Sequence, residues 1–247
     1  EHRLHTAGVS GSNPLAPTIS SISSVRTRVP AVAVRSESPT SHRGGVSHWL
    51  RVGRAGCRPV SDELTLTVLL TADQVRDRVR ELAAEINRSY PVGRDPHLVS
   101  VLKGGFVFLA DLVRALDRPV TIDFVAVASY GTGTRSSGVI TLTKDLEIGI
   151  ADRDVLIVED IVDTGQTLSW LLDSFEARHP RSLRTVSLLD KRSRRTVEVG
   201  IEHVGFTIED RFVVGYGLDY AEQFRHLPYI AVLDQPPAVR DTGSPRR

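Results

Sequence analysis

The amino-acid sequence predicts an α/β protein with a parallel, doubly wound sheet. Short runs rich in Val, Ile and Leu alternate with amphipathic segments between residues 71 and 233, an alternation typical of βαβ units. The chain has 247 residues, 40% hydrophobic and 25% charged, as in ordinary globular domains. Its single cysteine, Cys57, excludes an internal disulfide and a cysteine-rich zinc site. No run reaches the roughly 18 apolar residues of a membrane span, so we expect no membrane partner.

The charge distribution predicts three segments. Residues 1–62 are expected to be a disordered basic leader, residues 63–235 the folded domain, and residues 236–247 a polar tail. Residues 1–60 contain eight arginines, no lysine and two acids, and prolines interrupt them without any helical or strand period. This composition also fits a transit peptide, and a non-functional extension is the alternative. The rest of the chain has 23 basic and 28 acidic residues, so its net charge is negative and does not favour binding of nucleic acid.

The first predicted element of the folded domain is a helix that begins at Thr71. Gln74 lies three residues on and completes a capping box. Apolar residues then recur at helical spacing, at Val75, Val79, Leu82 and Ile86. The further predicted helices are residues 106–116 and 166–178, and the predicted strands are residues 97–102, 120–130, 139–144, 154–160, 183–190, 212–217 and 229–233. Ligands bind at the carboxyl ends of parallel strands, which directs attention to residues 103–105, 159–167 and 190–192.

The most informative motif is VLIVEDIVDTGQTL, residues 155–168. Its apolar strand delivers Glu159 and Asp160, and two carboxylates are costly to bury unless a hydrated cation or sugar hydroxyls receive them. The following turn, residues 163–167, is small and polar and leads into a helix, where backbone N–H groups favour a phosphate. The combination suits a ribose 5-phosphate, whereas the alternative is an acidic strand end with an ordinary capping turn. Neither a P-loop nor a dinucleotide-binding glycine fingerprint is present.

Five separated blocks carry a resemblance to a known family. VLIVEDIVDTGQTL resembles the phosphoribosyl pyrophosphate signature of type I phosphoribosyltransferases. The other blocks resemble the hypoxanthine-guanine phosphoribosyltransferase family; they are LKGG (102–105), SYGTGTRSSG (129–138), LLDKR (188–192) and FVVGYGLDYAEQFRHLPYIAVL (212–233). The resemblance covers roughly residues 68–234 and implies the type I phosphoribosyltransferase fold with a small hood. It also implies purine salvage, in which hypoxanthine or guanine replaces pyrophosphate on phosphoribosyl pyrophosphate and gives IMP or GMP.

The resemblance implies a role for each matched residue. Asp163 would lie near purine N7 as a general base or orienting group. The donor, phosphoribosyl pyrophosphate, would be bound by Lys103, Gly104, Ser129, Tyr130, Glu159, Asp160, Thr164, Gly165, Gln166, Thr167 and Arg225. The purine would be bound by Lys191 at O6, by Phe212 through stacking and by the carbonyl of Val213. Mg²⁺ would be the cofactor, held through Glu159, Asp160 and Asp219.

The same resemblance carries expectations about backbone and assembly. It implies a cis peptide between Leu102 and Lys103 and a mobile lid over residues 129–138. It also implies a homo-oligomer, a dimer or a tetramer, and we expect a cytoplasmic location. Two other functions stay open at this point. One is a phosphoribosyltransferase that prefers xanthine; the other is a regulator that binds nucleic acid on the same fold, which should lack the catalytic residues and carry a basic face.

Overall fold

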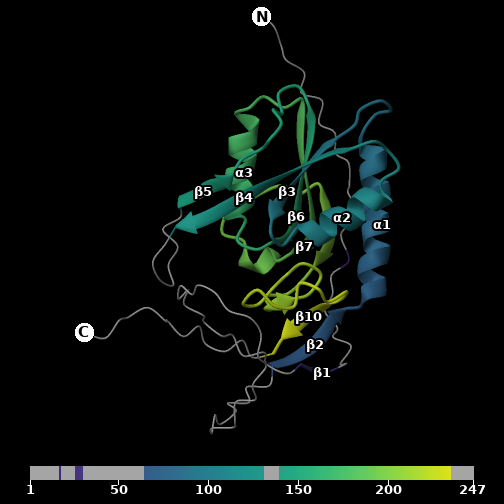
Figure 1. Cartoon of the computed structure of the whole chain (residues 1–247), viewed down its shortest axis with the longest axis vertical. Coiled ribbons are helices and arrows are strands. Elements are labelled where there is room, and N and C mark those ends of the chain that lie inside the picture. The colour runs from purple at the N-terminus through teal and green to yellow at the C-terminus, as the bar shows by residue number, and fades with distance from the viewer. Residues whose placement is uncertain (1–16, 18–25, 30–63, 131–138, 235–247) are drawn as a thin grey trace, which may run out of the picture.

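A computed structural model describes residues 17, 26–29, 64–130 and 139–234. Within them, the core is a six-stranded sheet (Figure 1). Its strands are β3 (His97–Leu102), β4 (Thr121–Tyr130), β5 (Val139–Lys144), β6 (Asp154–Val162), β7 (Ser182–Asp190) and β8 (His203–Thr207). They are arranged in the order β5-β4-β3-β6-β7-β8. All neighbours are parallel except β5, which pairs antiparallel with β4 at the sheet edge.

Helices cover both faces of this sheet, as a doubly wound fold requires. α1 (Ala72–Ser89) and α2 (Phe106–Ala115) pack on one face, and α3 (Gln166–Glu176) packs on the other (Figure 1). The strands are apolar on both sides for this reason: in β6, Leu156 contributes to the first cluster and Ile157 to the second. The predicted capping box at Thr71 and Gln74 is confirmed.

A second, four-stranded antiparallel sheet forms the hood, in the order β1-β2-β10-β9. Its strands are β1 (Arg26–Val29), β2 (Leu64–Leu70), β9 (Val213–Val214) and β10 (Ile230–Leu233). The hood packs around a small cluster of its own, which includes Leu66, Val214 and Phe224. Figure 1 places it below the carboxyl ends of the core strands. The predicted strands 212–217 and 229–233 supply β9 and β10 of this hood, and β9 is shorter than predicted.

Two strands and part of the leader differ from the sequence prediction. β2 and β8 were not predicted, and four leader residues, Arg26–Val29, form β1 against β2 instead of being disordered. Pro17 also accepts a hydrogen bond through its carbonyl from the Thr207 N–H, at 3.3 Å. The other leader residues up to 62, the lid residues 131–138 and the tail lie outside the described residues. Among the helices of the described part, none is long and apolar enough to cross a membrane.

Candidate active site

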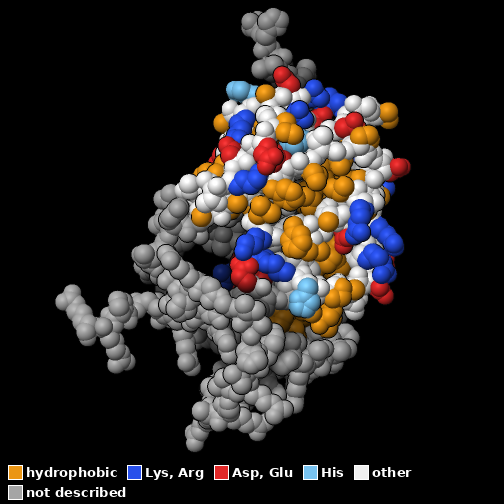
Figure 2. Space-filling view, viewed as in Figure 1, with side chains coloured by type: hydrophobic (Ala, Val, Ile, Leu, Met, Phe, Trp, Pro, Cys, Tyr) orange, Lys and Arg blue, Asp and Glu red, His pale blue; other side chains and the backbone are white. Residues whose placement is uncertain are grey.

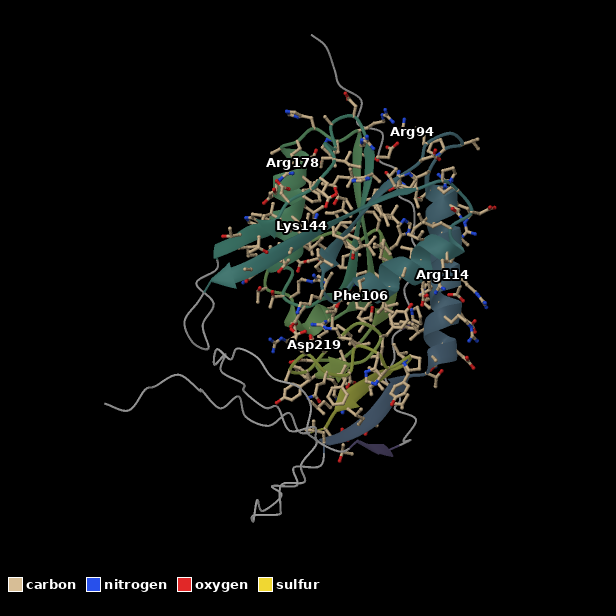
Figure 3. All side chains as sticks on the ribbon, viewed as in Figure 1. Arg94, Phe106, Arg114, Lys144, Arg178 and Asp219 are labelled. Atoms are coloured by element: carbon tan, nitrogen blue, oxygen red, sulfur yellow. The ribbon has the colours of Figure 1, made fainter. Side chains whose placement is uncertain are left out.

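The three strand ends singled out in the sequence converge next to the hood. They line one cavity of about 310 Å³, called here the site cavity, together with the segment between β9 and β10. Its lining contains the predicted residues Lys103, Gly104, Asp160, Asp163, Lys191, Phe212, Val213, Asp219 and Arg225. Figure 3 shows Asp219 at the boundary between core and hood. Strands β3, β6 and β7 are neighbours in the sheet, which is why residues almost 90 positions apart meet here.

The turn after β3 supplies the closest backbone approach in the cavity. The Leu102–Lys103 peptide is cis, as the resemblance implied. Gly104 follows it, and a Cβ added there would lie 1.7 Å from Asp160 Oδ2. A side chain at this position would displace the Asp160 carboxylate, so glycine keeps the carboxylate in place. The turn exposes its backbone to the cavity, where a large anion can be approached by N–H groups.

The acidic pair of β6 is divided between two cavities. The strand extends to Val162, so Glu159 and Asp160 lie within it and their side chains alternate. Asp160 lines the site cavity, and Glu159 lines an adjoining cavity of about 110 Å³, called here the turn cavity. Burial raises the pKa of Asp160 to about 6. Burial, and then the charge of Asp160, raise the pKa of Glu159 well above its ordinary range.

These carboxyl groups suit a divalent cation shared with a substrate. Both are desolvated, so a bound cation would favour their charged forms. No cluster of three or more His, Cys, Asp or Glu side chains capable of holding a metal alone occurs among the described residues. Mg²⁺ commonly takes one or two carboxylates and completes its shell with water and substrate oxygens. The donor set therefore fits Mg²⁺ bound together with a phosphorylated substrate.

The turn cavity is formed by the segment that leads from β6 into α3. Its lining includes Asp163, Thr164, Gly165 and Thr167 besides Glu159. Gly165 caps the helix with φ of 85°, and a Cβ there would lie 2.5 Å from the carbonyl oxygen of Val197. The first N–H groups of α3 have no partner within the helix, so the turn presents donors and a positive dipole end to an anion. Asp163 lines both cavities and marks where they join.

An aromatic ring, Phe212, and a buried cation, Lys191, also line the site cavity. Phe212 is 44% exposed although it is a large apolar side chain, and its ring packs edge-on against Tyr220 with centroids 5.7 Å apart. Lys191 is buried at the end of β7, and its N–H donates to the Val162 carbonyl at 3.0 Å. Its ammonium lies 4.0 Å from Asp210 Oδ1. A flat ring could stack on Phe212 and receive a hydrogen bond from Lys191.

Several residues of the site were missed in the sequence. Ile161 and Leu218 line the site cavity. Arg194, in the 3₁₀ turn Arg192–Arg194, lies 3.3 Å from Asp163 Oδ1. Glu222 lies 3.0 Å from the Lys103 ammonium. Glu222 lies midway in the sequence between Asp219 and Arg225, and this position between two predicted site residues could have identified it as a further site residue.

Among the predicted residues whose side chains the structure describes, Gln166 lines neither cavity. Gln166 is exposed at the first position of α3, and its N–H lies 3.4 Å from Thr164 Oγ1. Ser129 and Tyr130 end β4, where they pair with Ile140 and Val139 through the backbone. The positions of their side chains are outside what the structure describes.

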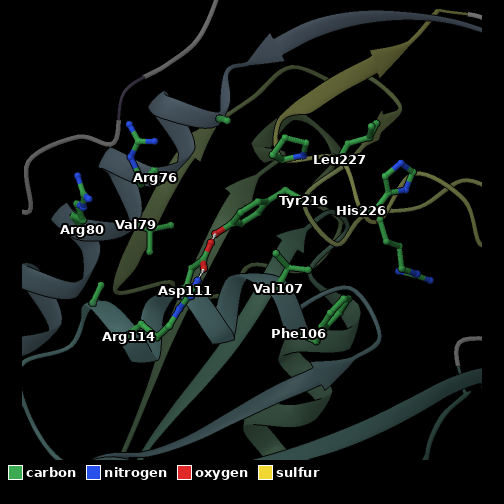
Figure 4. A pocket seen from close by; sticks show the side chains of 14 residues that line it. Arg76, Val79, Arg80, Phe106, Val107, Asp111, Arg114, Tyr216, His226 and Leu227 are labelled. Atoms are coloured by element: carbon green, nitrogen blue, oxygen red, sulfur yellow. Dashed lines mark hydrogen bonds and ion pairs between the residues drawn. The ribbon is translucent and has the colours of Figure 1, made fainter. Parts of the chain in front are cut away.

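A larger cavity lies elsewhere in the described part of the chain. It measures about 990 Å³ and lies between α1, α2 and the segment before β10 (Figure 4). Its wall contains apolar residues such as Val79 and Phe106, together with Asp111, whose carboxylate accepts a 2.6 Å hydrogen bond from the Tyr216 hydroxyl. Figure 2 shows apolar side chains gathered here, with arginines beside them over α1. It shares only Arg225 with the predicted site, so size does not identify the reactive centre.

The fold and the two adjoining cavities define a class of α/β enzymes that act on a phosphorylated sugar. Residues 67–221 match the family model described as "Phosphoribosyl transferase domain". The chain is 52% identical over 173 residues to the hypoxanthine-guanine phosphoribosyltransferase of Mycobacterium avium, covering 68% of this chain and 85% of that protein. It is 45% identical over 175 residues to the protein of the same name from Bacillus subtilis, covering 71% and 96%.

Solved structures give the same relationship. A hypoxanthine-guanine phosphoribosyltransferase from Bacillus anthracis, with a HEPES molecule in its active site, is 45% identical and superposes with a TM-score of 0.64, covering 67% of this chain and 96% of that one. The chain belongs to the phosphoribosyltransferase family, and within it to the hypoxanthine-guanine phosphoribosyltransferases. These relatives do not favour a nucleic-acid-binding regulator.

Proposed function

We propose that this enzyme transfers the 5-phosphoribosyl group of phosphoribosyl pyrophosphate to hypoxanthine or guanine, releasing pyrophosphate and forming IMP or GMP. The observation that carries the proposal is that Asp163 joins two cavities, one with a phosphate-type turn and one with an aromatic ring, a buried lysine and two further cations. A sugar phosphate, a flat base and a departing diphosphate each need one of those surroundings. The names of the relatives agree with this chemistry.

The donor would be held by three groups of residues. The turn with Thr164, Gly165, Gln166 and Thr167 would bind the 5′-phosphate through backbone N–H groups and hydroxyls. Lys103, Gly104 and Arg225 would bind pyrophosphate, with Ser129 and Tyr130 closing over it. Glu159 and Asp160 would receive the ribose hydroxyls, and with Asp219 they would hold Mg²⁺. When bound, Mg²⁺ supplies positive charge that neutralises the leaving group.

The purine would be selected on the other wall. Phe212 would stack on the ring, and the Val213 carbonyl would accept a hydrogen bond from the ring edge. The Lys191 ammonium would donate to O6. Adenine carries an amine at that position, so a lysine donor would be left without its acceptor and adenine would be rejected.

Catalysis would depend mainly on charge and position. As the bond to pyrophosphate breaks, positive charge develops on the ribose, and the carboxylates of β6 face it. Lys103 and Arg225 would stabilise the negative charge on the diphosphate. Asp163 would orient the purine through N7 and accept its proton. Loss of the proton at N7 leaves N9 as the nucleophile, and N9 forms the new bond to the anomeric carbon as the bond to pyrophosphate breaks.

We extend the proposal to assembly and location. The enzyme would form a dimer or a tetramer, and light scattering on the purified full chain tests this. It would act in the cytoplasm, and transferase activity measured in separated cell fractions tests that.

A spectrophotometric assay with Mg²⁺, phosphoribosyl pyrophosphate and each purine in turn tests the reaction. We expect conversion of hypoxanthine and guanine, slower conversion of xanthine, and none of adenine. Equal or faster use of xanthine would replace the stated specificity with the xanthine-preferring alternative. Absence of nucleotide product with every base would contradict the reaction itself.

A further inference from the structure

The two cations proposed to bind pyrophosphate already face a carboxylate of the chain. Lys103 Nζ lies 3.0 Å from both carboxylate oxygens of Glu222. Arg225 Nη2 lies 3.5 Å from Glu222 Oε2 and 2.8 Å from Asp219 Oδ1. The Glu222 carboxylate thus bridges the turn after β3 and the segment before β10. It therefore already pairs with both cations that are proposed to bind the diphosphate.

The backbone holds Glu222 in this place. Its φ is 63°, and those of Ala221 and Phe224 are 51° and 75°, a left-handed region that side chains other than glycine seldom adopt. The Glu222 N–H donates to Asp219 Oδ2 at 2.8 Å. Tyr220 and Gln223 exchange backbone hydrogen bonds of 3.2 and 3.0 Å across the same turn. Such a backbone persists only where its surroundings impose it, and here the turn directs one carboxylate at two cations.

We propose that Glu222 is an internal substitute for pyrophosphate: it neutralises and orients Lys103 and Arg225 in the empty site, gives way when the diphosphate of the donor enters, and returns as the product leaves. The inference rests on the roles proposed above for those two cations. A carboxylate offers two oxygens to the same donors that a phosphate group would use. It competes with the incoming anion and carries less charge than the diphosphate.

The exposure of the pair sets the size of the effect. Lys103 is 65% exposed and Glu222 67% exposed, so the ion pair between them is weak and can be broken at little cost. The competition is therefore mild. The Glu222 carboxylate keeps the cations in position in the empty site, and its competition limits how tightly pyrophosphate is retained. Release of pyrophosphate is the step that it favours most.

The test is the affinity of inorganic pyrophosphate, measured by titration calorimetry in buffer containing Mg²⁺. Glu222→Gln removes the competing charge and keeps the size of the side chain. We expect pyrophosphate to bind about two- to tenfold more tightly to this variant. Product inhibition by pyrophosphate should increase by a similar factor, and both differences should shrink at high salt because exposed charges are screened.

Glu147→Gln is the matched control, since Glu147 is 77% exposed and paired with Lys144 at 3.2 Å, away from the site cavity. It should bind pyrophosphate like the wild type. Unchanged or weaker binding by the Glu222→Gln protein would overturn the inference, because the carboxylate would then not compete. Lys103→Ala distinguishes failure of this inference from failure of the proposed function. If the Lys103→Ala protein binds pyrophosphate like the wild type, the proposed role of Lys103 is wrong as well.

Discussion

At the residue scale, Asp163, the proposed general base, also pairs with a cation, Arg194. Its carboxylate lines both cavities, and Arg194 Nε lies 3.3 Å from Oδ1. Arg194 Nη1 lies 3.4 Å from Asp210 Oδ2, and Asp210 also faces Lys191. The carboxylate that would meet purine N7 and the ammonium that would meet O6 are therefore connected through two charged side chains.

Replacing Asp163 tests the role of the carboxylate. We expect Asp163→Asn to lower kcat about 10²- to 10⁴-fold, because the amide cannot accept the proton. The KM for phosphoribosyl pyrophosphate should change little, since the donor is held elsewhere. Steady-state kinetics with each substrate varied would check both numbers. The control is Asp173→Asn, which changes an exposed carboxylate on α3. If the Asp163→Asn enzyme kept the wild-type kcat, Asp163 would have no part in the reaction.

Replacing Lys191 tests base selection. We expect Lys191→Ala to reduce the preference for hypoxanthine over adenine about tenfold or more, because the donor that rejects adenine is lost. The ratio of kcat/KM for the two bases is the measurement. Arg192→Ala removes a neighbouring cation whose side chain is 75% exposed and outside the site cavity, and it should keep the wild-type ratio. An unchanged ratio in the Lys191 variant would refute its assignment.

At the scale of elements, the turn between β6 and α3 has to meet two demands. In the proposed function it presents N–H groups to the phosphate, and it must also reverse into a helix. Gly165 makes both possible with its φ of 85° and its close approach to the Val197 carbonyl. The same conformation in a residue with a Cβ would be strained and would collide with backbone.

A glycine-to-alanine pair examines this turn. Gly165→Ala should lower the free energy of unfolding by about 1–3 kcal/mol and raise the KM for phosphoribosyl pyrophosphate. Denaturant unfolding and kinetics would measure the two effects. Gly200→Ala is the control, because nothing lies within 4 Å of an added Cβ there and its φ is ordinary. Equal behaviour of the two variants would mean that the turn tolerates a side chain.

Elements with strong local patterns were predictable from the sequence, and those that depend on distant partners were not. The capping box and periodicity located α1, and the apolar runs located the strands of the core sheet. β2 was missed because its pairing partner β10 lies about 160 residues further along the chain. Residues 212–217 and 229–233 were predicted as strands, but short apolar runs do not reveal which of two sheets they join. Among site residues, the motif located those at strand ends, whereas Glu222 meets Lys103 across 119 positions.

At the scale of the whole molecule, an ion-pair network stabilises the end of the sheet opposite the active site. Asp154, at the start of β6, is buried and accepts hydrogen bonds from Arg94 at 2.6 and 2.9 Å and from the Ser182 hydroxyl at 2.6 Å. Arg181 lies 3.3 Å away. Figure 3 shows Arg94 at the far end of the molecule from Asp219. Stability and catalysis are therefore supported by separate sets of charges.

This separation predicts a pH dependence of stability. The hydrogen bond from Arg94 holds the pKa of Asp154 below its ordinary value of 3.8. The stabilisation is fully present above that unfolded-state value and is lost as the pH falls through the lower folded-state pKa. Asp154→Asn should cost about 1–3 kcal/mol at pH 7. Below about pH 4 its free energy of unfolding should also fall less steeply than that of the wild type. Equal slopes in denaturant titrations at several pH values would contradict the prediction.

The hood joins strands from both ends of the domain, since β2 pairs with β10. During synthesis the core strands leave the ribosome before β10 does, so β2 must wait for its neighbour while the main sheet can already assemble. The nascent chain would acquire its sugar-phosphate turn first and its base-reading wall last. A chain arrested before residue 230 would therefore keep a folded core but lack a completed purine site.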